Sequence, residues 1–224
     1  MFLTETHMHT YPTSKCSHFS PKEAVERYSK EGYSTLIITD HFSANFGVDT
    51  DLSWDEKLEL FFEGYKEARA VGDLLGVCVL PAMELTMRTT PNDYLLYGVN
   101  KEFFERVGLP DVFDMTPAEI YPHAKATGIT VVQAHPYRGR CYPTPNCVDA
   151  LEVINTSPRH DNRTEEIMAV ALQHGLPMTG GSDAHRPEDV ARGGVITEKQ
   201  ILTLEDYVNA LYSGALQLKG RELV

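Results

Sequence analysis

The stretch Thr35-Leu36-Ile37-Ile38-Thr39-Asp40-His41 decides the fold that this sequence predicts. Residues 35–38 are apolar or β-branched throughout, which is typical of a parallel strand buried on both faces. An acid and a histidine follow shortly after this run. The stretch therefore predicts an α/β protein in which Asp40 and His41 leave the carboxyl end of a buried strand.

The same alternation of strand and helix extends along the whole chain. Strands are predicted at seven places, namely 1–5, 35–38, 77–80, 94–99, 129–132, 150–154 and 177–179. Helices are predicted over 21–31, 54–72, 117–128, 163–174 and 204–213, with capping boxes at Ser20, Ser53 and Thr116. Segments 43–52 and 136–148 are predicted to be loops. This order of elements predicts a parallel barrel or a wound sheet, in one domain over 1–224.

Composition and charge narrow the possible partners. The chain has 224 residues and a formal net charge of −12, which argues against an extended nucleic-acid surface. Its 4 cysteines form no C-x-x-C pair. The amino terminus is too short and too acidic for a signal peptide, and no run approaches the ~20 apolar residues of a membrane span. We therefore expect a soluble, reduced, cytoplasmic protein that acts on a small molecule; the sequence does not specify its oligomeric state.

Side chains that bind divalent metals stand at five of the predicted strand ends. They are His7 and His9, Asp40 and His41, Glu84, His135, and Asp183 and His185. Residues i and i+2 of an extended segment point the same way, so His7 and His9 can reach one ion, and Asp183 and His185 share this spacing. Pro136 is expected to hold His135 extended, and Gly180-Gly181 permits close backbone approach. Because the carboxyl ends of barrel strands share one face, the set predicts a multi-metal pocket and a metal-assisted hydrolase.

These residues, in this order, resemble a known family. The runs His7-x-His9-Thr10, Ile38-Thr39-Asp40-His41, Glu84, His135-Pro136 and Gly181-Ser182-Asp183-Ala184-His185 are similar to the polymerase-and-histidinol-phosphatase (PHP) domain. The resemblance covers nearly the whole chain. It implies a distorted (β/α)7 barrel and phosphoester hydrolysis with two or three zinc, manganese or iron ions. It also implies which side chains share each ion: His7, His9, Glu84 and Asp183 the first, Glu84 and His135 the second, and His41 and His185 the third.

Two positions depart from the family's pattern. Members often carry an acid or a histidine shortly after His-x-His-Thr, where this chain has Lys15, with Cys16 and His18 nearby as alternative ligands. Members also often carry a histidine on the strand after the bridging glutamate, where this chain offers Asp93. We therefore expect a core of two ions, and the binding of a third depends on these positions.

The expected reaction is hydrolysis of a small phosphomonoester or phosphodiester, such as a sugar, histidinol or nucleotide phosphate. A bound ion lowers the pKa of its water from 15.7 to about 7, which supplies the attacking hydroxide. Glu84, Asp183 and His185 are the expected catalytic residues, with Asp40 holding the second ring nitrogen of a ligand. Arg138 and Lys15 are the expected phosphate-binding residues. The alternatives are a C–N hydrolase of amidohydrolase type and a metal-stabilised regulatory module without turnover.

Overall fold

One curved sheet runs through the structure, a computed structural model that describes residues 1–220. The strands follow the order β10-β9-β1-β2-β4-β5-β6-β7-β8, and β3 pairs with β4 beside this path. Their bounds are β1 (Phe2–Glu5), β2 (Tyr33–Ile38), β3 (His41–Phe42), β4 (Cys78–Thr86), β5 (Asp93–Tyr97), β6 (Thr130–Gln133), β7 (Ala150–Asn155), β8 (Met178–Gly181), β9 (Gly194–Thr197) and β10 (Leu216–Lys219). The sheet forms a nearly closed barrel, as the sequence predicts.

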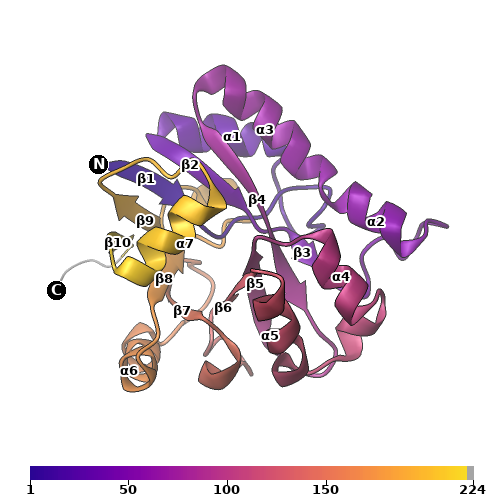
Figure 1. Ribbon diagram of the computed structural model, residues 1–224. Helices are drawn as coiled ribbons and strands as arrows, with labels where there is room; N and C mark the ends of the chain where they lie inside the picture. The colour runs from indigo at the N-terminus through magenta and orange to yellow at the C-terminus, as the bar shows by residue number, and fades with distance from the viewer. Residues whose placement is uncertain (221–224) are drawn as a thin grey trace.

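Helices pack around this sheet, and Figure 1 shows α1 and α3 together on one side, α4 and α5 on another, and α6 near β7 and β8. Their bounds are α1 (Pro21–Lys30), α2 (Trp54–Phe61), α3 (Glu63–Leu75), α4 (Lys101–Val107), α5 (Pro117–Ala126), α6 (Thr164–His174) and α7 (Leu204–Ser213). The capping boxes at Ser20, Ser53 and Thr116 form as predicted, since each side chain accepts a hydrogen bond from the third helical residue. Within residues 1–220, no helix is both long and apolar enough to cross a bilayer.

The barrel interior is an apolar cluster that α7 covers. Inward-facing residues of six strands meet side chains of α7 in this cluster, which includes Ile37, Leu80, Leu95, Tyr97, Val132, Ala150, Val195, Tyr207 and Leu211. Leu80 lies early in β4 and Ala150 begins β7, so α7 packs where parallel strands begin. The opposite edge, where the parallel strands end, is left for polar side chains. That is the edge at which the sequence places the candidate metal ligands.

The sheet is not parallel throughout, which corrects part of the prediction. β5 runs antiparallel to both β4 and β6, and β9 runs antiparallel to β1. A six-residue connection, 87–92, joins β4 to β5, and a link this short permits only a reversal of direction. The reversal brings the first residue of β5, Asp93, to the edge where the parallel strands end. The short strands β3, β9 and β10 were not predicted.

The helix predicted over 54–72 is two helices. α2 ends at Phe61 and α3 begins at Glu63, and Phe62 has the turn-like angles φ −84° and ψ 0°. Gly72 does not end α3. A Cβ atom there would lie 2.5 Å from the carbonyl oxygen of Val77, so glycine is required for α3 to pack against the chain entering β4. The helix ends instead at Gly76, whose φ of +70° favours glycine.

Candidate metal centre

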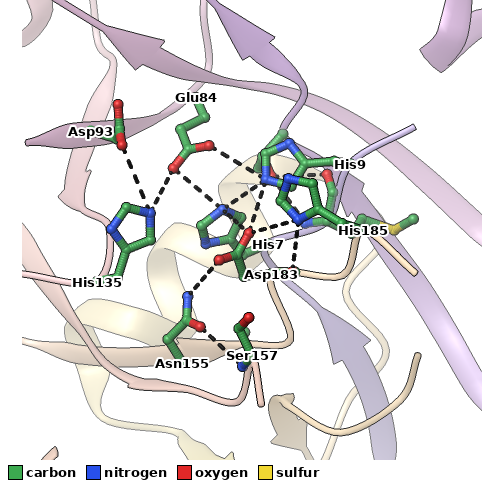
Figure 2. A network of polar contacts seen from close by, with 12 residues as sticks. His7, His9, Glu84, Asp93, His135, Asn155, Ser157, Asp183 and His185 are labelled. Carbon is green, nitrogen blue, oxygen red and sulfur yellow. Dashed lines mark hydrogen bonds and ion pairs between the residues drawn. The ribbon is translucent and has the colours of Figure 1, made fainter. Parts of the chain in front are cut away.

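The candidate ligands converge on one edge of the barrel. His7 and His9 follow β1, Glu84 lies near the end of β4, His135 follows β6, and Asp183 and His185 follow β8. Figure 2 shows their side chains pointing toward one another, with Asp93 reaching in from the start of β5. The site therefore assembles from residues far apart in the sequence, because strand direction carries them to the same edge.

Glu84 occupies the centre of this cluster. Its Oε1 lies 3.1 Å from His135 Nε2 and 3.5 Å from His7 Nε2. Its Oε2 lies 3.4 Å from His9 Nε2 and 2.7 Å from His41 Nδ1. The register of β3 on β4 explains the last contact, since His41 pairs directly with Glu84. Each carboxylate oxygen thus faces two imidazoles, which is the arrangement that a bridging carboxylate needs.

Asp183 stands on the other side of the histidines. Its Oδ1 lies 3.2 Å from His9 Nε2, 3.5 Å from His7 Nε2 and 3.3 Å from His185 Nδ1, while its Oδ2 accepts a hydrogen bond from Arg138. The backbone of Asp183 has φ +49°, a conformation that non-glycine residues seldom adopt. Such strain at a buried acid is typical of functional sites.

Four groups of ligand atoms each lie within 4.8 Å of one another. They are His7, His9 and Glu84; His7, His135 and Asp183; Glu84, Asp93 and His135; and His9, His41 and His185. Asp93 lies 4.0 Å from His135 Nε2 through Oδ2, and its Oδ1 accepts a hydrogen bond from Thr86. All eight residues predicted as metal ligands therefore lie in one connected cluster. The groups overlap at Glu84, His7, His9 and His135, so they form one extended site.

Glu152 orients His7 and was missed in the sequence. It lies within β7 and is 1% exposed. Its Oε1 accepts a hydrogen bond of 2.8 Å from His7 Nδ1, which leaves Nε2 of His7 free for an ion. Its Oε2 accepts from the backbone N–H of His135 at 2.9 Å. An acid within the otherwise apolar run Ala150-Leu151-Glu152-Val153-Ile154 was the available signal.

Asp40 is linked to the candidate ligand His9 by hydrogen bonds through Ser14. Its carboxylate accepts hydrogen bonds from the backbone and hydroxyl of Thr10, at 2.6 and 2.7 Å, and from Ser14 Oγ at 2.7 Å. The Ser14 hydroxyl donates to Asp40, so it accepts from His9 Nδ1 at 3.3 Å. The prediction put Asp40 itself against a ring nitrogen. Ser14 instead fixes the tautomer of His9 and leaves its Nε2 for an ion.

The donor set fits divalent cations. His7 Nε2 and His9 Nε2 lie 3.1 Å apart although the partners at their other nitrogens leave both with lone pairs. Glu84 Oε2 and His135 Nδ1 are buried and have no hydrogen-bond partner among residues 1–220; the approach of His41 to Oε2 is close but not aligned for a hydrogen bond. Unpaired buried acceptors are costly unless a cation satisfies them. Imidazoles with carboxylates suit zinc, manganese or iron.

Ionisation in the cluster also favours cations. Burial opposes ionisation of Glu84, but His41 and His7 outweigh it and hold the pKa of that carboxyl well below its usual value. Burial likewise opposes the charged form of His7, yet Glu152 and Asp183 raise its pKa well above the usual value. The acids thus stay ionised and collect positive charge around them. A divalent ion competes for these sites with the protons of the histidines.

A cavity of about 550 Å³ opens above the cluster, and four arginines line it. They are Arg138, Arg140, Arg159 and Arg186, and His160, which no pattern in the sequence singles out, lies among them. Three of the four pair with acids: Arg138 with Asp183, Arg159 with Asp189 at 2.7 Å to each carboxylate oxygen, and Arg186 with Glu188 at 4.0 Å. The cavity therefore combines an acid-and-histidine floor with cationic walls.

Two expectations about individual residues differ from the structure. His135 has φ +31°, so the prediction that Pro136 holds it extended is wrong; the bond from its N–H to Glu152 turns the backbone. Lys15 does not line the cavity, and its exposed ammonium pairs with Asp49 at 3.0 Å. Its role in binding phosphate stays a prediction. His18 is exposed and also lies outside the cavity lining, whereas Cys16 lines it.

Comparison with known proteins found one matching family model and several solved structures with a similar fold. Residues 161–216 match the family model described as PHP-associated. Over 99% of its length the chain superposes, with a TM-score of 0.72 and 16% identity, on a two-domain protein from Bacteroides vulgatus that contains a predicted PHP-like metal-dependent phosphoesterase. This chain spans 65% of that protein. No curated protein matches the sequence significantly.

Two further structures share the fold. A lesion-specific endonuclease from Pyrococcus furiosus matches 97% of this chain over 57% of its own, with a TM-score of 0.64 and 17% identity. An amidohydrolase from Chromobacterium violaceum, solved with bound sulfate and no metal, matches 98% of each chain with a TM-score of 0.56 and 14% identity. Identities this low show a common fold only.

Fold and site together define an α/β-barrel protein with a cluster of candidate metal ligands at the carboxyl ends of its strands. The chain is thus similar to the PHP-associated model over residues 161–216, and its fold resembles that of a protein containing a predicted PHP-like phosphoesterase.

Proposed function

We propose that this protein is a metal-dependent phosphoesterase that hydrolyses a small phosphomonoester or phosphodiester. The observation that carries the proposal is Glu84, a fully buried carboxylate whose two oxygens face four imidazoles from three segments of the chain, beneath a cavity walled by arginines. A buried cluster of anions with unpaired acceptors needs cations, and cationic walls above it attract an anion. Phosphoesters meet both requirements.

Three sets of residues would hold the ions. His7, His9, Glu84 and Asp183 would hold one ion, with Glu84, Asp93 and His135 holding a second and His41 and His185 a third. Bound zinc, manganese or iron supplies a water that ionises near neutral pH and positive charge opposite the phosphoryl oxygens. Glu152 and Ser14 would orient His7 and His9, and Asp40 would act on His9 through Ser14. His185, predicted as catalytic, acts in this scheme as a ligand.

The arginines would bind and orient the phosphoryl group. Arg159 is fixed by two hydrogen bonds to Asp189, and Arg138 is fixed by Asp183 and by Asn155 at 2.7 Å. Guanidinium groups held in this way need little reorganisation to contact the charge that develops on phosphoryl oxygens. Arg140 is exposed at the rim and forms no ion pair within residues 1–220. A cavity of about 550 Å³ suits a small molecule.

A substrate panel tests this function. We expect the protein loaded with manganese or zinc to hydrolyse p-nitrophenyl phosphate or bis-p-nitrophenyl phosphate and to leave p-nitroacetanilide intact. Arg140→Ala should raise KM for the phosphoester by about tenfold, because one charge contact contributes on the order of 1.4 kcal/mol. The matched control is Arg88→Ala, since Arg88 pairs with Asp114 and does not line the cavity.

Two results would contradict the proposal. Turnover of the anilide without turnover of either phosphoester would indicate a C–N hydrolase. Full metal loading without hydrolysis of any phosphoester, under each of the three metals, would indicate a binding or regulatory module.

A further inference from the structure

Cys16 lines the cavity, but the proposed reaction gives its thiol no role. It lies on the loop between β1 and α1, and its thiol lies close enough to the imidazoles of His41 and His185 to interact with both. The three side chains all line the cavity. A thiol beside two imidazoles offers the sulfur and nitrogen ligands that zinc prefers.

The histidines around Cys16 are arranged for a cation. His41 Nε2 and His185 Nε2 lie 3.3 Å apart. His185 Nδ1 donates to the carbonyl oxygen of Asp183 at 3.0 Å, so its Nε2 carries a lone pair directed at His41. The ring of His9 stacks on both rings, with centroids 4.1 and 4.2 Å away, and Figure 2 shows His9 and His185 side by side. A proton between His41 and His185 joins this pair without metal, and a divalent cation can take its place.

A second, independent observation comes from Glu84. Its Oε2 is buried and lies 2.7 Å from His41 Nδ1 and 3.4 Å from His9 Nε2, but no donor within residues 1–220 is aligned for a hydrogen bond to it. An unpaired carboxylate oxygen at this depth carries a large desolvation cost unless a cation offsets it. The oxygen faces His41 and His9, so an ion that satisfied it would lie beside His41, the imidazole that Cys16 also approaches.

We propose that Cys16 is a metal ligand, and that with His41 and His185 it forms a sulfur-and-nitrogen site distinct in chemistry from the rest of the centre. This proposal rests on the metal-dependent function proposed above. Binding would release the thiol proton to solvent and form a metal–thiolate bond. The neighbouring group of Glu84, Asp93 and His135 is rich in oxygen. Because thiolates favour zinc or ferrous iron over manganese, the third position would differ from the others in metal preference.

Cys141 provides a matched control within the same cavity. It also lines the cavity, but its thiol donates to the carbonyl oxygen of Pro91 at 3.0 Å, beside His135. No group of candidate ligands within residues 1–220 includes either cysteine by the 4.8 Å spacing. Cys16 approaches two candidate ligands, His41 and His185, whereas Cys141 approaches His135 alone. Serine substitutions at the two positions therefore separate ligation at the third position from general effects of losing a thiol.

The test is replacement of the metals by cobalt(II), whose bond to a thiolate gives a charge-transfer band in the near ultraviolet. We expect the band in the wild-type protein and in Cys141→Ser, and its loss in Cys16→Ser. The Cys16→Ser protein should also retain one zinc equivalent fewer per chain, while its binding of manganese stays unchanged. Melting temperature without metal shows whether each variant is folded.

Other results overturn the proposal. Cobalt bound to the wild type without the band would leave the metal centre standing and remove Cys16 from it. A band that persists in Cys16→Ser, or that is lost in Cys141→Ser instead, would assign the sulfur ligand elsewhere. Failure of the wild type to bind any cobalt, zinc or manganese would overturn both this inference and the proposed phosphoesterase function.

Discussion

The buried carboxylates of the site have two different roles, direct metal ligation and orientation of a ligating histidine. Glu84 and Asp183 offer oxygens to several imidazoles each, which suits direct ligation. Glu152 instead holds His7 Nδ1 and the backbone of His135. Burial alone would raise the pKa of Glu152, but His7 outweighs it and lowers that pKa. Its negative charge would make His7 a better ligand.

Glu152→Gln tests that role. We expect metal affinity to fall by about 10–100-fold, the usual effect of losing a partner that orients a metal-binding histidine. The glutamine amide also cannot accept from both His7 and His135, as the carboxylate does. Excess metal should restore most of the turnover, which can be followed by titrating activity against free zinc. Glu166→Gln on α6 is the control, because that exposed carboxylate pairs with Arg163. Unchanged metal affinity in Glu152→Gln would remove Glu152 from the centre.

The sequence predicts which side chains gather at the site, because they stand at strand ends that meet at one edge; their binding of metal stays a prediction. All eight predicted ligands lie in the cluster. Supporting residues are harder to find, since Ser14 and Glu152 act through hydrogen bonds between distant segments that no local pattern encodes. The positive φ of His135 follows from such a contact and reverses the preference that Pro136 sets.

At the level of elements, β8 must approach β1 closely for the centre to form. Gly181 ends β8, and a Cβ atom there would lie 2.5 Å from His7 Cβ and 3.1 Å from Glu152 Oε1. The expectation that Gly180-Gly181 allows close approach is confirmed. Met8 and Ala184 form a parallel bridge just beyond this contact, so the segments carrying His7, His9, Asp183 and His185 are held together by backbone pairing.

Gly181→Ala should displace His7. We expect overpacking to lower the free energy of unfolding by about 1–3 kcal/mol and to weaken metal binding as well, measured by chemical denaturation and zinc titration. Gly175→Ala is the control. Gly175 has φ +64°, and a Cβ atom there would meet no other atom within 4 Å, so alanine costs roughly 1–2 kcal/mol of backbone strain and leaves zinc affinity unchanged. Equal zinc affinity in both variants would show that the β8–β1 contact does not position His7.

Strand existence was easier to predict than strand direction. All seven predicted strands form, because runs such as Thr35–Ile38 carry strong apolar signals. The reversal of β5 depends on the short link after β4, and β9 joins β1 through a pairing between distant parts of the chain. Neither feature has a periodicity of its own. The reversal still serves the site, since it places Asp93 beside His135.

At the scale of the whole molecule, the part of the barrel that stabilises the fold is separate from the part that carries the candidate metal site. Its apolar interior, covered by α7 where the parallel strands begin, stabilises the fold. Its other edge concentrates buried acids and histidines, of which Glu84 Oε2 and His135 Nδ1 lack a hydrogen-bond partner within residues 1–220. Ion binding should therefore contribute to stability as well as to chemistry, because ligands that bind only the folded state shift the folding equilibrium.

The central claim is that Glu84 joins the ions of a phosphoesterase centre. The most direct measurement is the number of zinc or manganese ions bound per chain, together with phosphate release, in wild type and Glu84→Gln. We predict that Glu84→Gln binds fewer ions and that turnover falls by at least ~100-fold, since it loses charge at the reacting centre. Glu63→Gln, at the exposed start of α3, should match wild type, because Glu63 pairs with Lys66 and does not line the cavity. Full metal content and full turnover in Glu84→Gln would contradict the account.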